Sequence, residues 1–375
     1  MRINFSCWTF TGSSTVEEEQ PKAPLISDQP AISGQNLNPA VYESRITPLL
    51  KQWRALLKRD DDIHKSELEE IFTFLREVLT SFPEQLVLFP SEEGWNTARL
   101  FRMITAEILA KGVAYRDLQP ETDLVPIPVA LDNGEIICSQ FTVEKIPLPF
   151  GNDTLFAYGL RPEHPELFPP ILLFRGTTPY PAADTMQDTL LADTCPTGAG
   201  WDVLFEGKGI DKVAQWLHHA TEDGRYPAVV AGHSLAGALT QMVCAHLPRF
   251  VGEGFAFNSP GVSPCTHDLW HAHSERPFVC VLNREKDLVS LAGARFIGDV
   301  YEARTHQRLK WVIHAHSAHN ECILTQKTWA LHRVDHEQYC DSGLRGHVHQ
   351  LIRRVLDVGR PLISRLLTWG KNDAS

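Results

Sequence analysis

The sequence predicts an α/β protein with a mostly parallel β-sheet, helices on both faces of that sheet, and a helical region at the N-terminus. From residue 169 onward, short apolar runs alternate with amphipathic segments, which is typical of strands and helices in succession. The runs are apolar throughout, as in strands that are buried on both faces. Before residue 120, apolar residues instead recur at the i, i+3, i+4 spacing of helices.

The N-terminal part divides into a polar segment and a helical one. Residues 11–42 are rich in Ser, Pro, Gly and Gln, so we expect a flexible lead-in. Helical spacing then follows over 46–57, 68–79 and 95–111. Ser66 and Glu69 form a capping-box pattern before the second helix, and we expect the third helix to stop at Gly112.

The strands are expected from about residue 125. A DNGE turn leads into residues 135–148, and 153–160 forms a hairpin partner for them. Buried strands and helices then follow each other: strand 169–176, helix 210–221, strand 226–232, helix 235–247, strand 252–258 and strand 277–283. We therefore divide the chain into a lead-in (1–42), a helical region (43–120), an α/β core (121–330) and a C-terminal helical tail (331–375).

Composition limits the function classes. The formal net charge is −11, and an acidic chain repels phosphate backbones, so nucleic acid is not expected as a partner. No run of 18 apolar residues exists and no secretory signal peptide is evident. The eight scattered cysteines, several within apolar runs, indicate reduced thiols rather than a disulfide framework. We expect a cytoplasmic protein, or one exported without a signal peptide, and leave its oligomeric state open.

A serine stands where a strand is expected to give way to a helix, in AVVAGHSLAGALTQMV (228–243). A sharp turn there needs small residues two before and two after Ser234, and these are Gly232 and Ala236. The turn exposes the hydroxyl above the sheet and directs the Leu235 N–H toward a developing oxyanion. Ser234 is therefore a candidate nucleophile. The alternative is that it only caps the helix.

A serine nucleophile needs a base, and the base needs an orienting carboxylate. Asp287 follows the strand at 277–283, at the edge of the sheet where chemistry-bearing loops gather. Glu285, two residues earlier, is the competing acid. Asp287 would otherwise be a surface charge.

The base is expected in WVIHAHSAHNECIL (311–324), which contains three histidines. His319 falls in a loop that can reach over the edge of the sheet, and we favour it. His316 and then His314 are the alternatives. The three histidines also suggest metal binding as an alternative. No Cys–His spacing or paired carboxylate accompanies them, so we expect no metal or other cofactor.

A second oxyanion donor is expected from LLFRGTTP (172–179). This stretch ends a buried strand and places Thr177 at its carboxyl tip. Its backbone N–H would act together with that of Leu235. The alternative is a simple turn that ends the strand.

These motifs together resemble one family, the class 3 lipases of the α/β-hydrolase fold. GHSLAG (232–237) is similar to the elbow of that family, and FRGT (174–177) to its oxyanion strand. NREKDLV (283–289) resembles the region of the acid, FAFNSPGV (255–262) the strand before it, and AHNECIL (318–324) more loosely the histidine segment. The resemblance covers roughly residues 130–325, in the order expected.

The resemblance implies a serine hydrolase of carboxylic esters, a lipase, phospholipase or esterase acting on lipid substrates. It implies Ser234 as nucleophile, Asp287 as acid, His319 as base, and Thr177 and Leu235 as the oxyanion hole. The sequence departs from the pattern of the family at two places. Ala236 replaces a glycine, and residues 178–201 do not match the region that often forms a lid in the family. Met186, Leu190 and Leu191 in this region would belong either to a lid or to a buried helix.

Two alternatives to hydrolysis remain. One is an acyltransferase on the same fold, and the other is a catalytically inactive interaction protein that uses its N-terminal helices to bind. The tail at 346–371 is a basic amphipathic pattern split by Pro361. Such a tail either packs on its own domain or makes peripheral contact with an anionic membrane.

Overall fold

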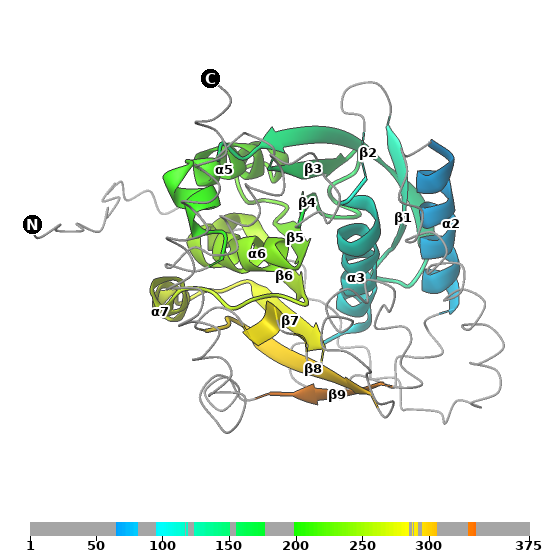
Figure 1. Ribbon diagram of the computed structural model, residues 1–375. Coiled ribbons are helices and arrows are strands. Elements are labelled where there is room, and N and C mark those ends of the chain that lie inside the picture. The colour runs from blue at the N-terminus through cyan, green and yellow to red at the C-terminus, as the bar shows by residue number, and fades with distance from the viewer. Residues whose placement is uncertain are drawn as a thin grey trace, which may run out of the picture. The chain divides into compact units, whose positions relative to one another are not determined.

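The computed structural model describes residues 65–81, 95–116, 118, 124–150, 155–176, 199–284, 287, 289–291, 295–305 and 329–334. Within these residues the chain is an α/β protein around one sheet (Figure 1). The predictions for helix 46–57 and for the lead-in lie outside the described residues. So does the C-terminal tail beyond Val334, while residues 331–333, which we assigned to the tail, belong to strand β9 (Trp329–Arg333).

The sheet contains nine strands in the described part of the chain, and their spatial order equals their order in the sequence. Strands β1 to β4 are antiparallel neighbours, β4 to β8 are parallel, and β9 is antiparallel to β8. The strands are β1 (Val125–Ala130), β2 (Ile136–Pro147), β3 (Phe156–Pro162), β4 (Ile171–Phe174), β5 (Ala228–His233), β6 (Val251–Phe257), β7 (Phe278–Arg284), β8 (Asp299–Thr305) and β9 (Trp329–Arg333).

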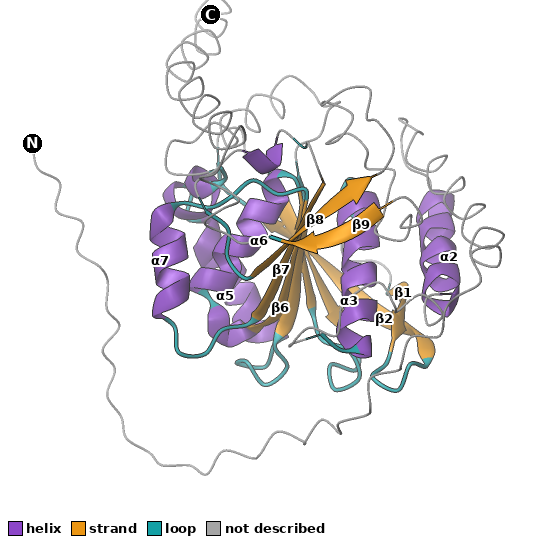
Figure 2. Ribbon diagram, turned by 90° about the horizontal axis from the view of Figure 1, so that it is seen from below, coloured by secondary structure: helices purple, strands orange, loops and turns teal. Residues whose placement is uncertain are grey.

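Helices cover both faces of the sheet, as the sequence predicts (Figure 2). One face carries α2 (Lys65–Ser81), α3 (Thr97–Ile108) and the π-helical turn η2 (Leu109–Val113). The other carries the π-helical turn η3 (Asp202–Glu206), α5 (Gly209–Ala220), α6 (Leu235–His246) and α7 (Pro264–Ala272). Two 3-10 turns, η4 (Pro248–Phe250) and η5 (Val289–Leu291), complete the described elements.

The helices divide in this way because of the strand order. Each of the parallel strands β4 to β7 lies beside the strand that precedes it in the sequence, so the sheet grows toward one side. Because crossovers between parallel strands are right-handed, every connecting helix then lies on the same face of the sheet. The opposite face is left for the N-terminal helices. Helices α2 and α3 contact β1, and α3 also contacts β5 and β6.

Side chains of the central strands alternate between the two cores. Leu173 and Val229 join the core under α2 and α3, whereas Leu172 and Val230 join the core under α5 and α6. Both sets are nearly inaccessible to solvent. This two-sided burial explains why these strands read as continuous apolar runs.

Most predicted elements are present, with small shifts at their ends. The DNGE turn closes the β1–β2 hairpin, with Gly134 at φ +83° and the Asn133 side chain accepting from the Glu135 N–H at 2.9 Å. The third helix does not stop at Gly112. The chain continues through that glycine as η2. Strands β8 and β9 and helix α7 were not predicted.

Two smaller expectations have mixed outcomes. The four described cysteines are free, but Cys138 and Cys265 are exposed, and only Cys244 and Cys280 are buried as expected. Among the described residues, no helix has both the length and the apolar character that crossing a membrane would need.

Candidate active site

Ser234 lies at the sharp turn between β5 and α6 in a strained backbone conformation. Its φ of 63° and ψ of −132° fall in a region that residues with a side chain rarely adopt, at a cost of about 1–3 kcal/mol. Two backbone hydrogen bonds fix the turn: the Ser234 N–H donates to Phe257 O at 2.9 Å, and the Gly237 N–H donates to Ser234 O at 2.8 Å. The sharp turn predicted at Ser234, between the end of β5 and the start of α6, is therefore present, and we call it the elbow.

The hydroxyl of Ser234 does not cap α6. No hydrogen bond from that helix start reaches the side chain, whereas the N-cap residues of α3 and α7 are used as caps. Asn96 Oδ1 accepts from the Arg99 N–H at 2.8 Å, and Ser263 Oγ accepts from the Thr266 N–H at 3.2 Å. The capping role weighed for Ser234 is thus not observed.

Small residues surround the elbow where the backbone is closest. A Cβ atom on Gly232 would collide with the carbonyl of Ala236 and would lie 2.8 Å from the Ala236 Cβ. Alanine at 236 is compatible with the turn because position 232 has no side chain. Gly237 is also constrained, since a Cβ there would lie 2.7 Å from Ser259 Oγ.

Leu235 opens α6 directly after the serine, with its side chain buried. The first N–H groups of a helix have no intrahelical acceptor and carry the positive end of the helix dipole. The Leu235 N–H therefore belongs to a helix terminus that favours negative charge next to the Ser234 turn.

The tip of β4 lies beside this turn. Strand β4 pairs in parallel with β5, with Leu173 opposite Ala231. A Cβ on Gly176 would collide with the carbonyl of His233 and with the hydroxyl of Tyr115. Gly176 thus permits β4 to end against the elbow. Thr177, the next residue, lies outside the described residues.

Asp287 is completely buried after the end of β7, so it is not a surface charge. Its carboxylate accepts two hydrogen bonds, from Asn258 Nδ2 to Oδ2 at 2.9 Å and from the Val289 N–H to Oδ1 at 2.9 Å. Ser290 Oγ donates to its backbone carbonyl at 2.8 Å. The side chain is therefore held in one orientation. Glu285 lies outside the described residues.

The three candidate histidines, His314, His316 and His319, lie outside the described residues. The strands on either side of their segment are described, however. Thr305, the last residue of β8, pairs with Trp329, the first residue of β9. Because β8 is parallel to β5 and β7, both residues lie at the carboxyl edge of the sheet, where Ser234 also lies.

Comparisons with known proteins find a similarity in structure but none in sequence. No family model matches the sequence, and no curated protein matches it. Part of the chain is similar in structure to a triacylglycerol lipase from Penicillium expansum, with a TM-score of 0.33 and 13% sequence identity. The similarity covers 56% of this chain and 80% of the lipase.

Several polar residues that organise the site were not singled out from the sequence. Asn258 holds Asp287, and the neighbouring Ser259 donates its N–H to Asn283 Oδ1 at 2.9 Å. Gln241 of α6 donates to Ser259 Oγ at 2.8 Å. Asn258 and Asn283 each come at the end of an apolar run, and that position is the sequence feature that could have identified them.

A tyrosine from the N-terminal helical region also reaches the elbow. Tyr115, which follows η2, shares a hydrogen bond with Nδ1 of His233 at 2.8 Å, and the two rings meet edge to face. His233 is buried and directly precedes Ser234. The helical region therefore contributes to the environment of the elbow.

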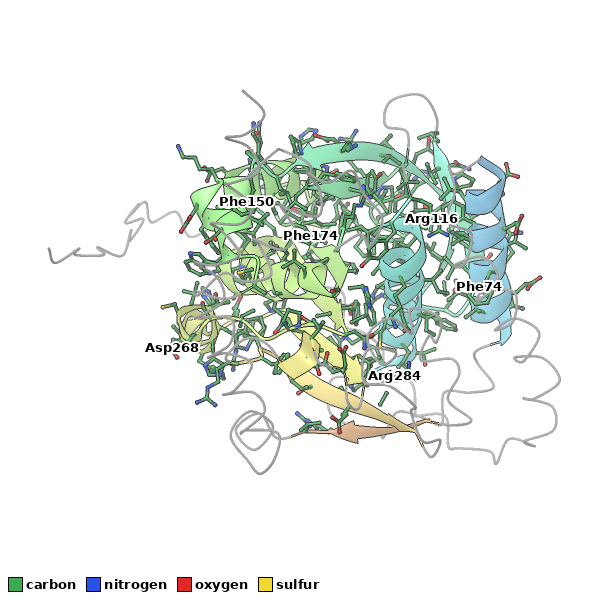
Figure 3. All side chains as sticks on the ribbon, in the orientation of Figure 1. Phe74, Arg116, Phe150, Phe174, Asp268 and Arg284 are labelled. Carbon is green, nitrogen blue, oxygen red and sulfur yellow. The ribbon has the colours of Figure 1, made fainter. Side chains whose placement is uncertain are left out.

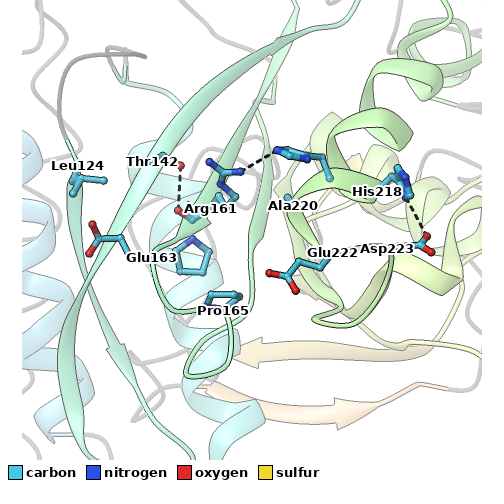
Figure 4. Close-up of a pocket in the computed structure, with 11 residues that line it drawn as sticks. Leu124, Thr142, Arg161, Glu163, Pro165, His218, Ala220, Glu222 and Asp223 are labelled. Carbon is cyan, nitrogen blue, oxygen red and sulfur yellow. Dashed lines mark hydrogen bonds and ion pairs between the residues drawn. The ribbon is translucent and has the colours of Figure 1, made fainter. Parts of the chain in front are cut away.

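The pocket drawn in Figure 4 is separate from this site. Its volume is about 610 Å³, and its lining includes Pro162, the end of α5, Glu222 and Asp223. Pro162 lies beyond Leu160, which pairs with Ile171, the first residue of β4. The pocket therefore lies at the amino edge of the parallel strands, opposite Ser234.

Proposed function

We propose that the protein is a serine hydrolase of carboxylic esters, with Ser234 as its nucleophile. The observation that carries this proposal is the strained turn at Ser234, whose hydroxyl is not used as a helix cap. Such strain persists only where the surrounding structure imposes it, and it is concentrated at functional positions. The two backbone hydrogen bonds that hold this turn support a role for Ser234 in nucleophilic attack.

In the proposed reaction, Ser234 Oγ attacks the ester carbonyl while His319 takes its proton. Asp287 orients the histidine, and the N–H groups of Leu235 and Thr177 stabilise the oxyanion. The C–O bond then breaks, and the protonated histidine gives its proton to the leaving alcohol. A water molecule, deprotonated by the same histidine, hydrolyses the acyl-enzyme and releases the acid.

The acid and the base of this proposal have different support. Asp287 is supported by its buried carboxylate, which two donors hold, whereas Glu285 lies outside the described residues. His319 is favoured over His316 and His314 by its position in the sequence alone.

For the substrate we propose a lipid ester. This rests on the resemblance of the GHSLAG, FRGT and NREKDLV motifs to class 3 lipases. As the alternative to packing of the tail at 346–371 on its own domain, we also propose that the tail makes peripheral contact with anionic membranes. Binding to anionic liposomes that survives deletion of residues 346–375 would contradict this second proposal.

The decisive experiment compares two serine variants that differ in structural role. Ser234→Ala should lower hydrolysis of a short-chain nitrophenyl ester by at least about a thousandfold and abolish labelling by a fluorophosphonate probe. Ser263→Ala removes the N-cap of α7 instead. It should lower thermal stability modestly and leave labelling intact.

Other outcomes decide among the alternatives. Unchanged hydrolysis by Ser234→Ala would refute the proposal. A wild-type protein that neither hydrolyses esters nor reacts with the probe would favour an inactive interaction protein. Ester products that appear on adding an alcohol acceptor would favour an acyltransferase.

A further inference from the structure

Helix α7 carries two histidines whose rings face each other. His267 and His271 are four residues apart, a spacing that places both on one face of a helix. Their Nε2 atoms are 3.2 Å apart, and their ring centroids are 4.4 Å apart. The helix connects β6 and β7 on the face opposite α3, and Asp268, on the same helix, lies at the outer side of the helix layer (Figure 3). This histidine pair takes no part in the candidate active site.

The distance between the two nitrogens suits chelation of one metal ion. Zinc bonds to imidazole nitrogen at about 2.0–2.1 Å, so nitrogens 3.2 Å apart would subtend an angle of about 100° at the metal. This angle lies between those of octahedral and tetrahedral coordination. The pair could act as a bidentate ligand once the lone pairs of both Nε2 atoms turn toward the ion, which would replace the proton of the Nε2–Nε2 hydrogen bond.

The surroundings of the pair admit a hydrated ion. The side chain of His267 is 25% exposed, and His271 is exposed, so water can fill the remaining coordination positions. Within the described residues, no group of three or more ligand side chains could hold a metal ion, so the described part of the chain would supply two ligands.

The charged neighbours of the pair act on it in opposite directions. Asp268 Oδ1 lies 3.5 Å from His267 Nδ1, and a carboxylate at this position raises the basicity of a metal-bound imidazole. Arg276 Nη1 lies 3.4 Å from His271 Nδ1. A metal bound to Nε2 of His271 requires a proton on Nδ1 of the same ring. The Arg276 N–H would then face another donor, and the positive charge of Arg276 would repel the metal ion. Arg295 adds a more distant positive charge near His267.

We propose that His267 and His271 form a binding site for one divalent transition-metal ion of the zinc, nickel and copper class, with water as the other ligands. Imidazole nitrogen suits this class of ion, whereas magnesium and calcium prefer oxygen. The proposal is independent of ester hydrolysis.

The test is calorimetric titration of the full-length chain, without a histidine tag, with nickel chloride near neutral pH. Wild type should bind one equivalent more than His271→Ala or His267→Ala, or bind that equivalent at least about tenfold more tightly. The matched control is the double variant His218→Ala, His219→Ala. It removes two adjacent histidines of α5 that do not share a helix face, and it should bind nickel as wild type does.

Three results would overturn the proposal: no binding by wild type, equal binding by wild type and both single variants, or loss of the same equivalent in the control. Circular dichroism checks that each variant is folded. A further variant, Arg276→Ala, should bind nickel about tenfold more tightly than wild type. Affinity equal to or below that of wild type would contradict the inferred geometry at His271 Nδ1.

Discussion

Asn258 is the residue that joins the elbow to the acid. It directly follows Phe257, whose carbonyl accepts from the Ser234 N–H, and its own N–H donates to Leu282 O at 2.9 Å. Its φ of 48° is left-handed, which asparagine tolerates better than most residues. The amide can therefore point at Asp287 Oδ2.

We predict that Asn258→Gly weakens catalysis more than folding. Glycine adopts the left-handed φ without strain, but it removes the donor to Asp287. A hydrogen bond to a charged group contributes about 1.5–3 kcal/mol, so kcat/KM for a nitrophenyl ester should fall about 10- to 100-fold. The control is Asn133→Gly in the β1–β2 turn, which should leave kcat/KM unchanged. Equal activity of both variants would exclude a positioning role for Asn258.

At the scale of elements, η2 brings the N-terminal helical region to the elbow. The π-helical turn extends α3 as far as Val113, and Tyr115 follows close behind it. Its hydroxyl occupies the place where His233 and Gly176 come together. The junction of β4, β5 and α6 thus depends on a part of the chain that lies outside the range of the class 3 lipase resemblance.

We predict that Tyr115→Phe destabilises the protein modestly and slows labelling of Ser234. Losing the hydrogen bond to His233 should cost about 0.5–1.5 kcal/mol in the free energy of unfolding, measured with denaturant. The labelling rate by a fluorophosphonate should fall in addition, because the elbow is less firmly held. Tyr226→Phe is the control, since Tyr226 lies far from the elbow at the start of β5. A slower rate in the control as well would assign the effect to general destabilisation.

At the scale of the whole molecule, an ion-pair network joins helix α3 to the sheet. Arg99 Nε and Arg102 Nε of α3 contact the carboxylate of Glu253 on β6 at 2.9 and 2.7 Å. Burial alone would raise the pKa of Glu253, but the hydrogen bonds and charges of Arg102 and Arg99 outweigh it and lower that pKa. Glu253 lies near the start of β6, at the edge opposite Ser234, so this network supports the fold rather than the chemistry.

We predict a pH-dependent stability difference between wild type and Glu253→Gln. Because the pKa is lower in the folded state than the ordinary value of 4.5, the ionised carboxylate stabilises the fold fully above that value. This stabilisation is lost as pH falls through the folded pKa. Wild type should therefore have the higher Tm near neutral pH, and the gap should shrink in acid. Glu69→Gln, an exposed change on α2, is the control, and a gap independent of pH would contradict the assignment.

The sequence was most informative where one physical requirement acts locally. Strands buried on both faces must be apolar throughout, and this pattern located β4, β5, β6 and β7 within one or two residues. The turn at Ser234 could be identified from the sequence because position 232 has to be glycine. Ala236, four residues along the chain, approaches it too closely to leave room for a side chain. Strands β8 and β9 lack such continuous apolar runs, and the start of α7 is marked only by Ser263 and Pro264.

The sequence alone determined the α/β class, the order of most strands and helices, and the position of Ser234 at the turn between two buried elements. These follow from periodicity and from contacts between near neighbours in the chain. Only the tertiary structure decided that Asn258 holds Asp287, that Tyr115 meets His233, and that α2 and α3 pack on one face of the sheet. The two hydrogen bonds, Asn258 to Asp287 and Tyr115 to His233, join residues that are 29 and 118 positions apart in the sequence. Their partners are set by strand order and crossover direction, which no local pattern encodes.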